Sequence, residues 1–160
     1  MTHCRSSFLL LILCSSPLFA EESSPFDNLE YRSIGPAIGG RVSRAVGVPG
    51  DASTYYLAAS MGGVWKSTDG GIEWEPIFDD QPVSSIGSIA LAPSNPNVIY
   101  VGSGEANPRG NVASGNGIYK STDAGETWKH VWKSKGQIGT MIVHPKNQEI
   151  AYAAGFGRIF

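Results

Sequence analysis

The feature that most constrains the fold is a short segment that occurs twice. Residues 62–74 read GGVWKSTDGGIEW, and residues 116–128 read NGIYKSTDAGETW. Each copy has an aspartate between a Ser-Thr pair and a glycine, and each copy ends in tryptophan. We call residues 67–74 the first box and residues 121–128 the second box. A segment repeated in this way indicates a repeated supersecondary unit.

The sequence around the boxes repeats as well, and it does so three times. Three prolines each precede a short polar stretch, and each is followed at the same offset by a tyrosine. The spacing of these units is in the range of propellers and solenoids, on the order of 20 to 50 residues. The three pairs are Pro49 with Tyr56, Pro93 with Tyr100, and Pro145 with Tyr152.

Each unit contains short segments rich in β-branched and aromatic residues, separated by turn-forming residues, which predicts consecutive antiparallel strands. Four strands in a unit of this length are typical of a β-propeller blade. We therefore predict an all-β chain, a β-propeller of four-stranded antiparallel blades with two blades and part of a third. The expected strands are 42–48, 54–59, 63–68 and 73–78, then 86–92, 98–103, 117–122 and 127–133, then 138–144 and 150–154.

The N-terminus has the order of a secretory signal peptide. Arg5 precedes an apolar run at 8–13, and the small residue Ala20 precedes two glutamates. The run is too short to cross a bilayer about 30 Å thick, so we expect no stable membrane span. We predict a secreted, periplasmic or cell-envelope protein, with lipid anchoring at Cys14 as an alternative. The expected divisions are signal peptide 1–20, N-terminal lead-in 21–41, first blade 42–78, second blade 79–133 and partial third blade 134–160.

Composition excludes several classes of function. Both cysteines, Cys4 and Cys14, lie in the predicted signal peptide, so we expect neither a disulfide framework, nor a cysteine nucleophile, nor a Cys-ligated zinc in the mature chain. The formal net charge is −2 and no basic run is present, which argues against nucleic acid as a partner. We predict no cofactor and no metal.

Each box lies between the third and fourth expected strands of its unit, where a hairpin must turn. An aspartate there accepts backbone N–H bonds from the following loop, and a glycine takes the positive φ of the turn. A catalytic carboxylate or a metal ligand is the alternative, but a calcium loop needs several oxygen ligands at alternating positions, and each box supplies one carboxylate. We interpret the boxes as turn architecture. The residues given this structural role are Ser67, Asp69, Gly71, Trp74, Ser121, Asp123, Gly125 and Trp128.

The two boxes resemble the Asp-box, or bacterial neuraminidase repeat, of pattern Ser-x-Asp-x-Gly-x-Thr-Trp, and only Glu73 departs from it. The run 31–160, including SIGPAIGGRVS and GSGEANPRG, resembles the N-terminal part of large secreted bacterial propeller proteins with sortilin-like repeats, often labelled glycosyl hydrolases. The resemblance implies that the remaining blades of a longer protein are partners of this N-terminal fragment. It does not determine activity, because Asp-boxes occur in sialidases, xyloglucan hydrolases, sortilin-type receptors and photosystem assembly factors.

The predicted strand order places the loops between second and third strands, and the connections between blades, on the rim opposite the boxes. The longest such loop is 104–111, and elaborated loops on rigid scaffolds tend to carry binding residues. In the alternative, the loop residues brace one another and the neighbouring blade. Aromatic residues that are exposed would stack on sugar rings, although aromatics in blade strands more often belong to the core. The aromatic residues to which both alternatives apply are Tyr31, Trp65, Tyr119 and Trp132. The ligand-binding candidates are Arg41, Glu105, Asn107 and Arg109, and Glu105 is also the candidate for a catalytic carboxylate.

We predict that this portion of a propeller binds a glycan or an extracytoplasmic protein on that rim and is not catalytic by itself. The alternative is part of a sialidase-like or xyloglucanase-like glycoside hydrolase whose remaining catalytic residues lie beyond this fragment. Resemblance to xyloglucan-hydrolysing propellers implies an aspartate where this chain has Ser60, which argues against that chemistry. A scaffold for the assembly of other exported proteins is a third class, and it predicts an apolar patch on the rim.

Overall fold

The computed structural model describes residues 41–107 and 110–156, and the backbone of residues 158–159. The chain divides into the units 1–33 and 34–160, and every described residue belongs to the second unit. The predicted signal peptide, most of the lead-in segment and the candidate residue Arg109 lie outside the described residues.

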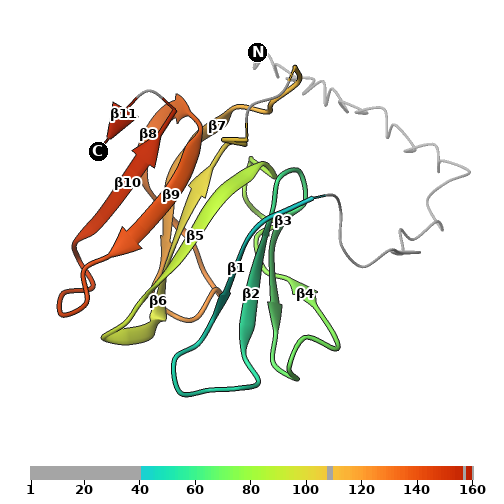
Figure 1. Cartoon of the computed structure of the whole chain (residues 1–160), viewed down its shortest axis with the longest axis vertical. Helices are drawn as coiled ribbons and strands as arrows, with labels where there is room; N and C mark the ends of the chain where they lie inside the picture. The colour runs from blue at the N-terminus through green and yellow to red at the C-terminus, as the bar shows by residue number, and fades with distance from the viewer. Residues whose placement is uncertain (1–40, 108–109, 157, 160) are drawn as a thin grey trace, which may run out of the picture. The chain divides into compact units, whose positions relative to one another are not determined.

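The described residues form three antiparallel sheets in which consecutive strands are neighbours (Figure 1). Two sheets have four strands each and the third has three, so the predicted all-β fold of propeller blades is confirmed. The first blade contains β1 (Val42–Gly47), β2 (Tyr55–Ala59), β3 (Gly63–Ser67) and β4 (Glu75–Pro76); the second contains β5 (Ile86–Ala92), β6 (Asn95–Ser103), β7 (Gly115–Ser121) and β8 (Lys129–Gly136); the third contains β9 (Ile138–Val143), β10 (Ala151–Gly155) and β11 (Arg158–Ile159).

The fourth strands of the first two blades differ most from the expected bounds. Both start later than expected, because each box aspartate accepts a backbone N–H that would otherwise begin the strand. This N–H belongs to Glu73 in the first box and to Thr127 in the second. Strand β4 is also short, and Pro76 lacks the N–H that a longer ladder needs. Strand β11 is an addition, since two strands were expected in the third unit.

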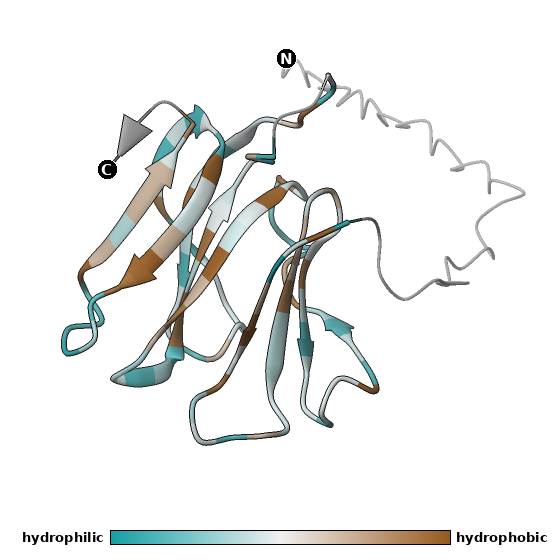
Figure 2. Ribbon diagram, in the orientation of Figure 1, coloured by the Kyte–Doolittle hydropathy of each residue, from teal (hydrophilic) through white to brown (hydrophobic). Residues whose placement is uncertain are grey.

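The hydrophobic core lies between neighbouring blades. One buried cluster joins the first and second blades, with Tyr56, Phe78 and Tyr119 among its largest members. A second cluster joins the second and third blades and includes Ile138 and Met141. Full burial of an aliphatic or phenyl side chain contributes about 1.5–3 kcal/mol to the stability of the folded chain. The blades therefore stabilise one another across their faces. In Figure 2 hydrophobic residues recur along the strands, and the turns at the lower edge are mostly hydrophilic.

The turns divide into two groups at opposite ends of the strands. The boxes lie beside the β1–β2 and β5–β6 turns, because Gly70 N donates to Ser53 O at 2.9 Å and Ala124 N donates to Asn97 O at 2.9 Å. These turns form the lower edge in Figure 1. The β2–β3 and β6–β7 loops and the β8–β9 connection lie at the other end, which we call the upper rim. The described residues contain no helix that could cross a membrane.

Candidate functional site

In the first box, the aspartate closes its own turn. Ser67 Oγ donates to Asp69 Oδ1 at 2.7 Å and accepts a bond from Gly71 N at 2.9 Å. Asp69 also accepts from Ile72 N at 2.9 Å and from Glu73 N at 3.0 Å. The carboxylate is therefore engaged within the turn, and these contacts are those of a loop-organising residue.

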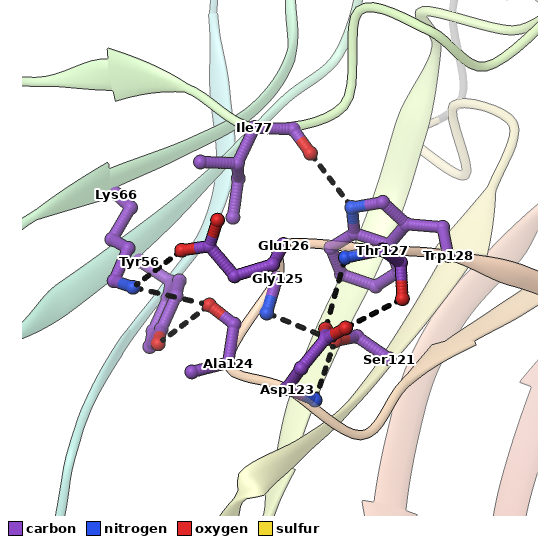
Figure 3. Close-up of polar contacts among 10 residues, drawn as sticks. All are labelled: Tyr56, Lys66, Ile77, Ser121, Asp123, Ala124, Gly125, Glu126, Thr127 and Trp128. Atoms are coloured by element: carbon purple, nitrogen blue, oxygen red, sulfur yellow. Dashed lines mark hydrogen bonds and ion pairs between the residues drawn. The ribbon is translucent and has the colours of Figure 1, made fainter.

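The second box has a similar arrangement, in which a threonine hydroxyl takes the place of the backbone N–H that Ile72 supplies in the first box (Figure 3). Ser121 Oγ donates to Asp123 Oδ1 at 2.7 Å and accepts from Gly125 N at 2.9 Å. Thr127 donates to Asp123 through its N–H at 2.9 Å and through its hydroxyl at 2.5 Å. Glu73 stands at the corresponding place of the first box and supplies the N–H alone. Threonine at this position thus binds the aspartate through two of its own groups.

The second box also joins two blades, whereas the first box bonds to its own blade. The indole Nε1 of Trp128 donates to Ile77 O of the first blade at 2.7 Å, and its ring meets Phe78 edge-on with centroids 5.1 Å apart. The indole of Trp74 instead donates to Gly71 O of its own turn at 2.9 Å. The same motif therefore has a local role in one copy and an interblade role in the other.

Hydrogen bonds lower the pKa of the box aspartates. The side-chain bond from Thr127, followed by its N–H and by Ser121, lowers the pKa of Asp123 to about 2. The bond from Ser67 is the largest cause that lowers the pKa of Asp69. Since the folded pKa lies below the ordinary value of 3.8, each ionised carboxylate stabilises the folded chain above that value.

We expect the folded chain to lose stability as the pH falls from about 4 to about 2, the interval between the ordinary pKa of 3.8 and the folded pKa of about 2. Protonation of Asp123 removes the charge that holds Thr127. Chemical denaturation from about pH 6 to about pH 2 measures this, with Thr127→Val as the comparison. In the variant the pKa of Asp123 in the folded chain should lie closer to its ordinary value, so the acid-dependent loss of stability should be smaller than that of the parent. Identical acid profiles would contradict the assignment.

On the upper rim, the structure brings two of the sequence-predicted site residues together. Arg41 forms an ion pair with Glu105, whose side chain is fully buried, while the side chain of Arg41 is 47% exposed. The backbone N of Glu105 donates to Ala113 O at 2.9 Å. Asn107 is exposed. Direct contact between Glu105 and a ligand would require the ion pair to separate.

Ser60 lies beside this pair. Its N–H donates to Arg41 O at 2.8 Å, it is 2% exposed, and its Oγ meets no hydrogen-bond partner among the described residues. A serine hydroxyl carries no charge at neutral pH and cannot serve as the carboxylate of a glycosidase pair. This part of the rim therefore has one buried, paired carboxylate and one uncharged hydroxyl.

The structure adds a recess on the upper rim that the sequence analysis missed. It has a volume of about 150 Å³ and lies between the β8–β9 connection and the end of β10. Phe156 is 71% exposed at its edge, and its N–H donates to Gln137 O at 2.9 Å. Polar side chains and a second aromatic also line it: Trp132, Ser134, Lys135 and Gln137. The available signal was an aromatic residue, Phe156, two positions after the expected strand 150–154.

The other aromatic candidates are less accessible. Tyr119 is buried and stacks on His130 with ring centroids 4.2 Å apart. Trp65 is half-buried, and its indole donates to Gly62 O at 2.6 Å. Among the described residues, no group of three or more His, Cys, Asp or Glu side chains is arranged to hold a metal ion.

These sheets define the chain as part of a β-propeller. No family model matches it. It is 31% identical over 113 residues to the xyloglucanase Xgh74A of Acetivibrio thermocellus, covering 61% of this chain and 12% of that protein. It is 25% identical over 124 residues to a probable oligoxyloglucan-reducing end-specific xyloglucanase of Neosartorya fischeri, covering 74% of this chain and 14% of that protein. The chain thus spans a small part of these relatives' length.

Solved structures agree with the fold. An ancestral GH74 enzyme superposes with a TM-score of 0.58 at 23% identity, covering 71% of this chain and 16% of that chain. The GH74 xyloglucanase of Xanthomonas campestris also gives a TM-score of 0.58, at 21% identity, covering 78% of this chain and 19% of that chain. The likeness is one of fold, to a segment of each enzyme.

Proposed function

We propose that this chain is part of an exported β-propeller that acts on xyloglucan, and that the described residues supply polysaccharide contacts on the upper rim. The observation that carries the proposal is the 31% identity over 113 residues to a xyloglucanase. The GH74 propeller fold supports it. The boxes are, in this proposal, Asp-boxes that organise hairpins and leave the opposite rim to the ligand.

The geometry favours binding over hydrolysis for these residues. A glycosidase needs two carboxyl groups about 5–10 Å apart that face the scissile bond, whereas Glu105 is buried against Arg41 and Ser60 is uncharged. The recess beside Phe156 offers an exposed aromatic ring with polar neighbours, which suits a pyranose ring with its hydroxyl groups. Hydrolysis by the whole protein therefore needs carboxylates other than Glu105 in its ion pair.

Affinity electrophoresis of the full-length protein in gels containing xyloglucan tests the proposal, with xylan and hydroxyethyl cellulose as comparison polymers. We expect retardation by xyloglucan above both comparison polymers. Phe156→Ala should weaken binding about tenfold, a loss of about 1.4 kcal/mol. The matched control is Ile142→Ala, because Ile142 is also exposed, at 65%, and lies on β9 away from the recess.

Reducing-sugar release from xyloglucan by the same protein separates binding from hydrolysis. Release would support the hydrolase form of the proposal, and retardation without release would support a binding propeller. Equal mobility in all three polymers, together with no release, would remove the proposed function.

A further inference from the structure

The first strands of the three blades, β1, β5 and β9, lie side by side (Figure 1). A groove with a volume of about 340 Å³ lies on them, and all three strands contribute to its lining. Pro49 of the β1–β2 turn and Pro93 of the β5–β6 turn also line it, so it lies toward the lower edge of the blades. We call it the first-strand groove. It is separate from the recess beside Phe156 on the upper rim.

Aliphatic side chains form most of the walls of this groove. Strand β5 supplies Ile89, which belongs to the core cluster between the first and second blades. Strand β9 supplies Met141 and Val143, which belong to the cluster between the second and third blades. Other aliphatic residues that line it are Val46, Leu91 and Ile142. Because the packing of the blades holds these walls in place, the groove is formed before a ligand binds.

The walls suit a hydrocarbon chain better than a sugar ring. None of the described residues that line the groove is aromatic, whereas stacking on a pyranose uses an aromatic face. An unbranched alkyl chain instead gains free energy from every methylene group that leaves water. The first-strand groove is therefore a different kind of site from the recess beside Phe156.

One cationic side chain lies at this groove. Arg44 is exposed, and it is the one charged residue among the described residues of the lining. Its Nη2 donates to Gly139 O of β9 at 3.2 Å, which uses one of the five N–H donors of a guanidinium. No carboxylate of the described residues forms an ion pair with Arg44. The guanidinium is thus held beside the apolar walls with N–H donors that no described carboxylate occupies.

The acidic residue nearest to Arg44 along the chain is engaged elsewhere. Asp51, in the turn after β1, accepts from Ser53 N at 2.8 Å through one oxygen and from Thr54 Oγ1 at 2.6 Å through the other. A guanidinium binds a carboxylate through two parallel N–H···O bonds. The charge of the groove therefore favours a ligand that brings its own carboxylate.

We propose that the first-strand groove binds an aliphatic carboxylate with a chain of about six to ten carbon atoms, the size that suits a small site of this volume. The carboxylate pairs with Arg44, and the chain lies against Ile89, Leu91 and Met141. This site is independent of the proposed action on xyloglucan, because that action is assigned to the upper rim.

A ligand-detected NMR titration of the full chain with octanoate tests the proposal. We expect saturable binding, with affinity rising about twofold for each methylene group from butanoate to octanoate, since each group is half-buried in an open groove. Octanol lacks the charge and should bind about tenfold more weakly. Absence of saturable octanoate binding would overturn the proposal. Equal affinity for acetate or for octanol would also overturn it, because the site would then bind any anion or any alkyl chain.

Two pairs of variants locate the ligand. Arg44→Gln should weaken octanoate binding about tenfold, whereas Lys133→Gln, at an exposed lysine of β8 outside the lining, should preserve it. Ile142→Glu should weaken binding at least about threefold through charge repulsion, whereas Ile150→Glu should preserve it. Ile142 is 65% exposed and Ile150 is 41% exposed, and only Ile142 is in the lining. Unchanged affinity in both Arg44→Gln and Ile142→Glu would overturn the placement of the ligand in this groove.

The two proposed sites can be separated in the same protein. Phe156→Ala should leave octanoate binding unchanged, and saturating octanoate should leave the retardation by xyloglucan unchanged. Retardation by xyloglucan without octanoate binding would overturn this inference alone. Octanoate binding without retardation by xyloglucan or sugar release would overturn the proposed function and support this inference.

Discussion

Replacement of Gly117 by alanine should destabilise the chain by at least about 3 kcal/mol. Gly117 has φ of 129°, and a Cβ built there would lie 1.8 Å from Trp132 O and 3.1 Å from His130 Nε2. The close approach arises because β7 and β8 pair with register shifts on both sides of this residue. Alanine would therefore force the two strands apart within the second blade.

Thermal or urea denaturation followed by circular dichroism measures this loss. Gly136→Ala is the matched control, because a Cβ at Gly136 meets no atom within 4 Å, and we expect its effect to stay within about 0.5 kcal/mol. An unchanged midpoint for Gly117→Ala would contradict the pairing of β7 with β8.

Trp128→Ala should cost about 3 kcal/mol, close to the lower end for large aromatic truncations. The change removes the bond from the indole to Ile77 O and the edge-on contact with Phe78. It leaves a carbonyl of the first blade without this partner, which has a further cost when the group is buried. The loss falls on the joint between the first and second blades.

Trp74→Ala is the matched comparison and should cost about 1 kcal/mol. The indole of Trp74 bonds Gly71 O within its own turn, so its removal leaves the interblade core intact. Chemical denaturation of both variants measures the difference. Equal losses would contradict the interblade role of the second box.

Much of the fold could be predicted from the sequence because its determinants are local. Alternating β-branched and aromatic residues with turn residues between them predicted the strands, and β5 has the expected bounds of Ile86–Ala92. The serine, aspartate and glycine of each box act on residues within a few positions of themselves. Strand ends were less predictable, because the carboxylates of the box aspartates compete with the hydrogen-bond ladder of the sheet for the same backbone N–H groups.

Two parts of the candidate sites could not be predicted in this way. The pairing of Arg41 with Glu105 joins residues far apart in the chain, so the sequence position of Glu105 is compatible either with bracing the fold or with meeting a ligand. The recess beside Phe156 depends on where the β8–β9 connection passes the end of β10. Neither arrangement follows from periodicity or spacing.

The blade as a unit, the position of each hairpin and the hydrogen-bonding chemistry of the boxes follow from the order of the amino acids, because these features depend on neighbours along the chain. What each copy of the box does depends instead on contacts between blades. Trp74 and Trp128 occupy the same place in the same motif, yet one bonds its own turn and the other bonds the preceding blade. The physical reason is the surface beside each box. The second box packs against Tyr56, Lys66 and Ile77 of the first blade. A contact between blades is set by packing rather than by the motif.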